Sequence, residues 1–202
     1  IPAFKDVGYE EFISHKFQLI NSVTSVEKLE EVVGELAGED FRQDMEAGLR
    51  AAPMNVRVSP YLISRIDWDN PYDDPLRIQF IPVASKRLPE HPQLTLDSLH
   101  EQDDSPTPGL VHRYPDKVLF LPLDVCPVYC RFCTRSYAIG GDTNQVEKVG
   151  YKYNPKRWDN AFAYLASRPE IEDVVVSGGD AWNLAPMHLE IILKTLLAIP
   201  HI

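Results

Sequence analysis

The sequence predicts an α/β protein in which a helical N-terminal region precedes two strand–helix units. Apolar residues recur at helical spacing from Tyr9 to about Leu49, and prolines and aspartates interrupt the middle of the chain. After Pro115 the pattern changes to strand, helix, strand, helix. Because strands joined by a helix pair in parallel within one sheet, we expect the second half to begin a parallel sheet.

Residues 1–115 are expected to form the helical region and an irregular connection rich in proline and aspartate. The stretch "YEEFISHKFQLI" has the apolar spacing of a helix, and Thr24 with Glu27 predicts a capping box that opens the helix "VEKLEEVV". Residues 82–109 contain five prolines and the acidic run "HEQDDSPTPG", which is typical of a segment without regular structure.

Residues 116–202 are expected to hold the two strand–helix units. The strands are predicted in "KVLFLPLDV" and "DVVVSGGD", and the first should bulge or end near Pro122 because proline cannot donate a ladder hydrogen bond. The helices are predicted in "NPKRWDNAFAYLASRP", with Asn154 as its cap and Pro155 in its first turn, and in "APMHLEIILKTLLAIP". The chain begins at Ile1 and stops where another strand would follow, so we expect a truncated fragment.

Composition excludes several classes of protein. A chain of 202 residues with 44% hydrophobic residues can bury a core. Its 30 acidic and 20 basic residues give a net charge of -10, which argues against a nucleic-acid partner. The sequence has no run of about 18 apolar residues and no recognisable secretory signal, so we expect no membrane partner and a cytoplasmic location.

All three cysteines lie within eight positions of the stretch "LPLDVCPVYCRFCTRSYAIGG". Cys126, Cys130 and Cys133 directly follow the first predicted strand, with the spacing Cys-x3-Cys-x2-Cys. A structural zinc site usually has four protein ligands, whereas an iron–sulfur cluster held by three thiolates keeps one iron open for a reacting ligand. The alternatives are a zinc site completed by His112 or His188, and three core cysteines without a metal.

A second candidate site ends the second predicted strand. Gly178 and Gly179 let the backbone approach a ligand closely and add amide donors, and Asp180 follows them. Taken alone, these three residues are better explained as a tight turn from strand to helix. Their position one strand–helix unit after the cysteine loop favours a ligand site.

The cysteine spacing, with Phe132 just before the last cysteine, resembles the radical S-adenosylmethionine (SAM) enzymes. The stretches "DSPTPGLVHRYPDKVLF", "CRFCTR" and "SGGDAWNL" are similar to the lysine 2,3-aminomutase group of that superfamily, and "SPYLISRIDWDNPYDDPLRIQFIP" is similar to its helical N-terminal region. The resemblance implies the first two βα units of a radical-SAM partial TIM barrel, with the active site at the C-terminal ends of the strands. It also implies three cofactors, which are a 4Fe-4S cluster on the three cysteines, SAM and pyridoxal phosphate.

The resemblance assigns two SAM-binding elements to this chain. Phe132 would lie against the adenine, although the aminomutases often have histidine there. Gly178, Gly179 and Asp180 would hold the amino group of the methionine moiety, and Asp180 stands where many members have glutamate.

The resemblance also assigns residues to pyridoxal phosphate and to the substrate. Arg113 and Lys117 would bind the cofactor phosphate, Lys117 replacing the arginine usual in the family. Arg135 would receive the substrate α-carboxylate, and Ser136 and Tyr137 follow it where the family often has further arginines. The lysine that forms the Schiff base belongs to later strands of the family, so no catalytic residue is expected here and the chain alone should be inactive.

The expected function is therefore that of a SAM- and pyridoxal-phosphate-dependent isomerase that moves the α-amino group of an amino acid, L-lysine first, to the β carbon. A related aminomutase acting on glutamate or a protein-bound lysine is one alternative. A zinc-stabilised structural or binding module is the other. The expected partners are a small amino acid substrate, an electron donor for the cluster and, in the complete enzyme, further copies of the same chain.

Overall fold

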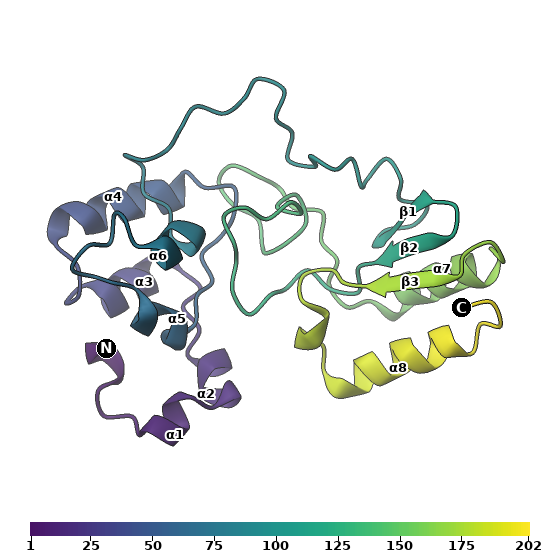
Figure 1. Cartoon of the computed structure of the whole chain (residues 1–202), viewed down its shortest axis with the longest axis horizontal. Coiled ribbons are helices and arrows are strands. Elements are labelled where there is room, and N and C mark those ends of the chain that lie inside the picture. Colours follow the sequence, from purple (N-terminus) through teal and green to yellow (C-terminus); the bar gives the residue numbers. More distant parts are fainter. The chain divides into compact units, whose positions relative to one another are not determined.

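The computed structural model describes all residues, 1–202, and they form two compact units. Unit 1 consists of Ile1–Leu94, Pro127–Cys133 and Gly140–Glu147, and unit 2 consists of Thr95–Cys126, Thr134–Ile139 and Lys148–Ile202. The helices of the first half lie in unit 1, and the sheet with its helices lies in unit 2 (Figure 1). No helix is long and apolar enough to cross a membrane.

Unit 1 is helical, which confirms the prediction for the N-terminal region. A 3-10 helix at Pro2–Phe4 precedes six short helices, which are α1 (Tyr9–Phe12), α2 (His15–Ile20), α3 (Val26–Val33), α4 (Glu39–Arg50), α5 (Pro60–Arg65) and α6 (Pro75–Phe80). Apolar side chains of α3, α4 and α5 meet in one core that includes the fully buried Leu29, Met45 and Ile63. Burial of such side chains is the main contribution to the stability of this unit.

The cap of α3 differs from the predicted one by a single residue. Ser25, not Thr24, is the N-cap, and its side chain accepts a hydrogen bond of 3.2 Å from the amide of Lys28. The helix begins at Val26, so the hydroxyl three positions before Lys28 is the one that can reach an unpaired amide of the first turn.

The sheet of unit 2 has the strand order β1-β2-β3, with β1 at Leu110–Tyr114, β2 at Lys117–Phe120 and β3 at Asp173–Val176. β2 and β3 pair in parallel, as the sequence predicts. β2 ends before Pro122, which confirms the expected end of that strand. β1 was not predicted, because residues 110–114 were assigned to the irregular connection. It forms an antiparallel hairpin with β2 across the turn at Pro115 and Asp116. The residues before and after the expected boundary at position 115 therefore belong to the same unit.

Two helices cover one face of this sheet. α7 (Pro155–Ala166) connects β2 to β3, and α8 (Pro186–Leu197) follows β3 after a 3-10 helix at Ala181–Asn183 (Figure 1). Both helices contribute to a core formed around Phe120 and Ile171. Asn154 caps α7 as predicted, accepting a hydrogen bond from the amide of Arg157. The structure thus confirms the α/β class.

Candidate functional site

The cysteine loop begins where the chain leaves the sheet. All three cysteines are partly buried thiols, Cys126 in unit 2 and Cys130 and Cys133 in unit 1. The amide of Cys133 donates to the carbonyl of Cys130 over 3.3 Å, which closes a turn between these two residues. Burial raises the pKa of the Cys130 thiol, and the neighbouring Cys133 raises that pKa further.

The metal ligands predicted in this loop are three cysteine thiols. No group of three or more histidine, cysteine, aspartate or glutamate side chains is arranged to hold a metal ion, so the three-thiolate cluster stays a prediction. The histidines of the zinc alternative have aromatic partners: His112 Nδ1 lies 2.8 Å from the hydroxyl of Tyr164, and the His188 ring stacks on Tyr153 at 4.2 Å between centroids. An iron–sulfur cluster with an open iron requires three thiolates, whereas a structural zinc site usually requires a fourth protein ligand.

The second half of the cysteine loop is anchored to the helical unit by its backbone. The amide of Tyr129 donates to the carbonyl of Arg57, and the amide of Arg131 donates to that of Gln79, both over 2.9 Å. Phe132, which is next in the chain, keeps 66% of its surface exposed. An exposed ring held between two cysteines is available to stack on a planar ligand.

The segment after β3 lies against the segment after β2. The amide of Gly179 donates to the carbonyl of Leu123 over 2.9 Å, and the amide of Asp180 donates to that of Val125 over 3.0 Å. A Cβ atom at Gly178 or Gly179 would come within 2.5 Å of a backbone oxygen of the other segment. These glycines are therefore required for the close approach of two backbones. The amide of Gly179, one of the two expected to face a ligand, is bonded to the neighbouring loop instead.

Asp180 keeps one carboxylate oxygen for other partners. Its Oδ1 accepts a hydrogen bond of 3.1 Å from the amide of Trp182 and thereby caps the 3-10 helix at Ala181–Asn183. Its second oxygen can accept a hydrogen bond from an ammonium group, the chemistry that the predicted role requires.

Arg157, which the sequence analysis missed, holds the start of the cysteine loop. From the first turn of α7 its buried guanidinium donates to the carbonyls of Leu121 at 2.9 Å, Pro122 at 2.7 Å and Tyr151 at 2.9 Å. Burial lowers the pKa of Arg157. The sequence indicated that this arginine is buried, because it directly precedes Trp158 on the helix face that packs inward.

Arg135 is held by a buried carboxylate from another part of unit 2. Its Nε lies 3.1 and 2.9 Å from Oε1 and Oε2 of Glu101, and its Nη2 lies 2.7 Å from Oε1. The hydroxyl of Tyr137 donates to Oε2 of the same carboxylate over 2.9 Å. Burial is the main cause that raises the pKa of Tyr137 far above its ordinary value, so this hydroxyl remains a donor. Glu101 was not singled out in the sequence, where it is one acid in an acidic run.

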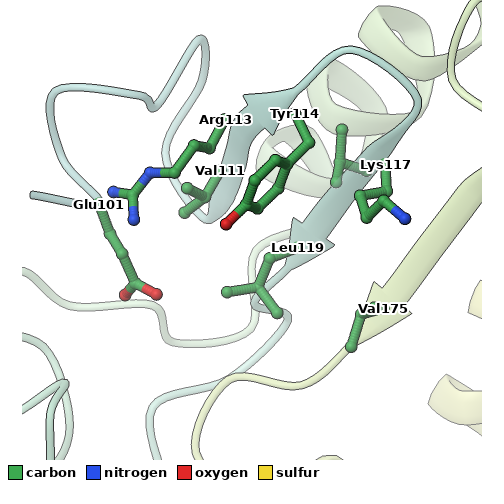
Figure 2. Close-up of a pocket in the computed structure, with 8 residues that line it drawn as sticks. Glu101, Val111, Arg113, Tyr114, Lys117, Leu119 and Val175 are labelled. Atoms are coloured by element: carbon green, nitrogen blue, oxygen red, sulfur yellow. The ribbon is translucent and has the colours of Figure 1, made fainter. Parts of the chain in front are cut away.

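Arg113 and Lys117 line the same pocket of about 190 Å³, on the hairpin of β1 and β2 (Figure 2). Its walls include Val111, Leu119 and Val175, and Glu101 lies on the same side as Arg113.

Each of the two cations already has an acidic neighbour. Arg113 Nε donates to Asp104 over 2.7 Å, a bond that raises the pKa of Arg113, and Lys117 Nζ lies 3.5 Å from Asp116. Figure 2 shows the Arg113 guanidinium and the Lys117 ammonium on opposite sides of the Tyr114 ring, so the binding of one phosphate by both stays a prediction.

Comparison with known proteins gives relatives along the whole chain. No family model matches it. L-lysine 2,3-aminomutase of Bacillus subtilis is 38% identical over 202 residues, 100% of this chain and 40% of that protein. L-lysine 2,3-aminomutase of Fusobacterium nucleatum is 38% identical over 98% of this chain and 44% of its own length. Glutamate 2,3-aminomutase of Clostridioides difficile is 31% identical over 96% of this chain and 42% of its own length.

These relatives define a class, the 2,3-aminomutases of amino acids. Along nearly its whole length the chain is similar to lysine 2,3-aminomutases, which confirms the resemblance seen in its motifs. The chain spans about two-fifths of the length of the curated relatives it matches.

Proposed function

We propose that this chain is the cluster-binding part of a radical-SAM 2,3-aminomutase that moves the α-amino group of an amino acid, L-lysine first, to the β carbon. The observation that carries the proposal is an identity of 36–38% to four lysine 2,3-aminomutases across 98–100% of the chain. The order β2, α7, β3, α8 with a parallel β2–β3 pair supports a partial TIM barrel that begins at residue 116. In this proposal the complete enzyme has the length of its relatives.

Cys126, Cys130 and Cys133 would hold the 4Fe-4S cluster through their thiolates. When bound and reduced, the cluster supplies the single electron that cleaves the sulfonium of SAM. The exposed ring of Phe132 would stack on the adenine, and the second carboxylate oxygen of Asp180 would accept from the amino group of SAM. Gly178 and Gly179 act indirectly, because they bring Asp180 beside the loop that begins at Leu123.

Arg113 and Lys117 would bind the phosphate of pyridoxal phosphate in the pocket that they share. When bound, that cofactor carries the amino group between the two carbons. Arg135 would orient the substrate through its α-carboxylate, since a guanidinium can make two parallel hydrogen bonds to a carboxylate. The cytoplasm would suit this site because a reducing compartment keeps the three thiols free to bind iron.

The proposal is tested by product analysis with the complete enzyme, reconstituted without oxygen and supplied with SAM, pyridoxal phosphate and an electron donor. L-lysine, L-glutamate and a lysine-containing peptide are offered separately, and the β-amino acid is measured by chromatography. We expect β-lysine from free lysine. If a product forms only from glutamate, or only from the peptide, that compound replaces lysine as the proposed substrate. No product from any of the three would overturn the proposal.

A further inference from the structure

The buried carboxylate of Glu101 occupies only one edge of the Arg135 guanidinium. Nε and Nη2 donate to Glu101, whereas Nη1 donates to neither of its oxygens. A guanidinium has five N–H groups and offers two edges that can pair with a carboxylate, the side edge of Nε and Nη2 and the end edge of Nη1 and Nη2. Glu101 takes the side edge, so the end edge is left for a second carboxylate.

The two partners differ in exposure in a way that fixes their roles. The Glu101 side chain is 5% exposed and the Arg135 side chain is 22% exposed, so the carboxylate is buried whereas part of the arginine side chain is accessible to solvent. Glu101 also accepts from the hydroxyl of Tyr137, which is itself buried. Displacing Glu101 from Arg135 would leave a buried carboxylate without its cation, which is strongly unfavourable. A ligand carboxylate therefore gains more from the open edge than from competition with Glu101.

Glu101 also lies beside the two candidate phosphate-binding residues. It lines the same pocket as Arg113 and Lys117, and its charge acts on the Arg113 guanidinium (Figure 2). One buried carboxylate thus connects the candidate phosphate-binding residues with the candidate carboxylate-binding residue.

We propose that Glu101 is a positioning residue for Arg135: with Tyr137 it holds the guanidinium by its side edge and presents the end edge to the α-carboxylate of the amino acid substrate. This proposal rests on the proposed function, because the proposed function assigns Arg135 to the binding of the substrate. It makes Glu101 a determinant of substrate affinity that itself does not touch the substrate.

The test compares two ligands that differ only in the carboxylate, L-lysine and 1,5-diaminopentane, in binding to the complete enzyme. Glu101→Gln should weaken the binding of L-lysine about tenfold or more, the value of one hydrogen bond to a charged group, and leave the diamine unchanged. Tyr137→Phe should also weaken the binding of L-lysine, by a smaller factor. It replaces Glu101→Gln as the test variant if Glu101→Gln does not fold. Glu170→Gln, which removes the acid of the exposed Arg168–Glu170 pair, is the matched control and should change neither.

A double-mutant cycle shows whether Glu101 acts through Arg135. In the Arg135→Lys background, Glu101→Gln should add less than twofold to the loss of lysine affinity, because the group that Glu101 positions is already altered. Additive losses would overturn the positioning role. Tighter lysine binding by Glu101→Gln would also overturn it, since Glu101 would then be competing with the substrate.

The same measurements separate the two proposals. Lysine binding that is lost in Arg135→Lys but unchanged in both Glu101→Gln and Tyr137→Phe would overturn the positioning role and leave the substrate role of Arg135 intact. An enzyme that shows the expected binding pattern without forming a β-amino acid would overturn the proposed reaction and leave the positioning role standing. Equal binding of both ligands in the parent would overturn the substrate role of Arg135 and, with it, the positioning role of Glu101.

Discussion

Gly178 lies so close to Leu123 that a Cβ atom at residue 178 would be 2.5 Å from the Leu123 carbonyl oxygen. Gly178 also has a φ of 108°, in the region that side chains other than glycine rarely adopt. The cysteine loop starts from the Leu123 segment, so this contact fixes where the loop leaves the sheet relative to the chain after β3. The two glycines of the Gly-Gly-Asp motif thus allow two backbone segments to pack closely, and Asp180 is the candidate ligand-binding residue.

Replacing Gly178 by alanine should destabilise the protein by about 2–4 kcal/mol, since the new methyl group meets backbone atoms and the φ value adds strain. Urea unfolding followed by circular dichroism measures the loss. Gly150→Ala is the matched control in the same unit, because a Cβ atom there would meet nothing nearer than 3.8 Å. A loss below 0.5 kcal/mol for Gly178→Ala, on the order of ordinary surface changes, would contradict the close contact.

Replacing Arg157 by methionine should cost about 3 kcal/mol, because the carbonyls of Leu121, Pro122 and Tyr151 lose their buried donor. Thermal unfolding monitors the change. The neighbouring exposed Lys156→Met is the control and should remain within about 0.5 kcal/mol of the parent. Equal stability of the two variants would show that Arg157 does not support the loop.

Asp44 should give the helical unit a pH-dependent stability. Burial raises the pKa of this carboxyl, but hydrogen bonds from the hydroxyl and amide of Ser85 outweigh burial and hold the pKa below its ordinary value of 3.8. A carboxyl with a lowered folded pKa contributes stability that is present above its unfolded pKa and is lost as the pH falls through the folded pKa. Asp44→Asn should therefore lose about 1 kcal/mol at pH 7, and the difference from the parent should shrink below about pH 4.

Urea unfolding of the parent and Asp44→Asn between pH 3 and pH 7 checks this dependence. Ser85→Ala is the companion variant, because it removes the hydroxyl that donates to Asp44 and keeps the amide. At pH 7 Ser85→Ala should lose part of the unfolding free energy that Asp44→Asn loses. A difference between the parent and Asp44→Asn that is constant across this range would mean that the Asp44 carboxylate is not stabilised by Ser85.

The features predicted correctly from sequence depend on short-range chemistry. Asn154 followed by Pro155 defines the start of α7, and Pro122 prevents β2 from continuing. The parallel pairing of β2 with β3 follows from the helix between them. Three cysteines at fixed spacing were visible for the same reason, since a loop motif is continuous in the chain.

The features that were missed depend on contacts between distant residues. Glu101 and Arg135 are 34 positions apart, and nothing in the acidic run distinguishes the one carboxylate that becomes buried. Arg157 contacts carbonyls 35 and 36 positions earlier. β1 was missed because "LVHRY" lies beside a proline-rich segment, although Pro115 and Asp116 between two apolar stretches are typical of a hairpin turn. The shift from Thr24 to Ser25 is a one-residue error in a correct helix start.

The cysteine ligands can be tested one at a time. Alanine at Cys126, Cys130 or Cys133 should each abolish cluster assembly, because in the proposed site all three thiolates are needed to hold the cluster with one iron open. Visible absorbance and iron content after reconstitution report the loss. Phe132→Leu is the control within the loop and should keep its iron, since its side chain is not a ligand. A full cluster in any of the three alanine variants would reject that cysteine as a ligand.

The assignment of the cysteine loop is tested most directly by iron, acid-labile sulfide and zinc analysis of this chain after reconstitution without oxygen. We expect iron and sulfide in equal amounts, about four of each per chain, with an electron paramagnetic resonance signal after reduction that changes when SAM is added. One tightly bound zinc per chain with no sulfide would contradict it and identify the loop as part of a zinc-stabilised module.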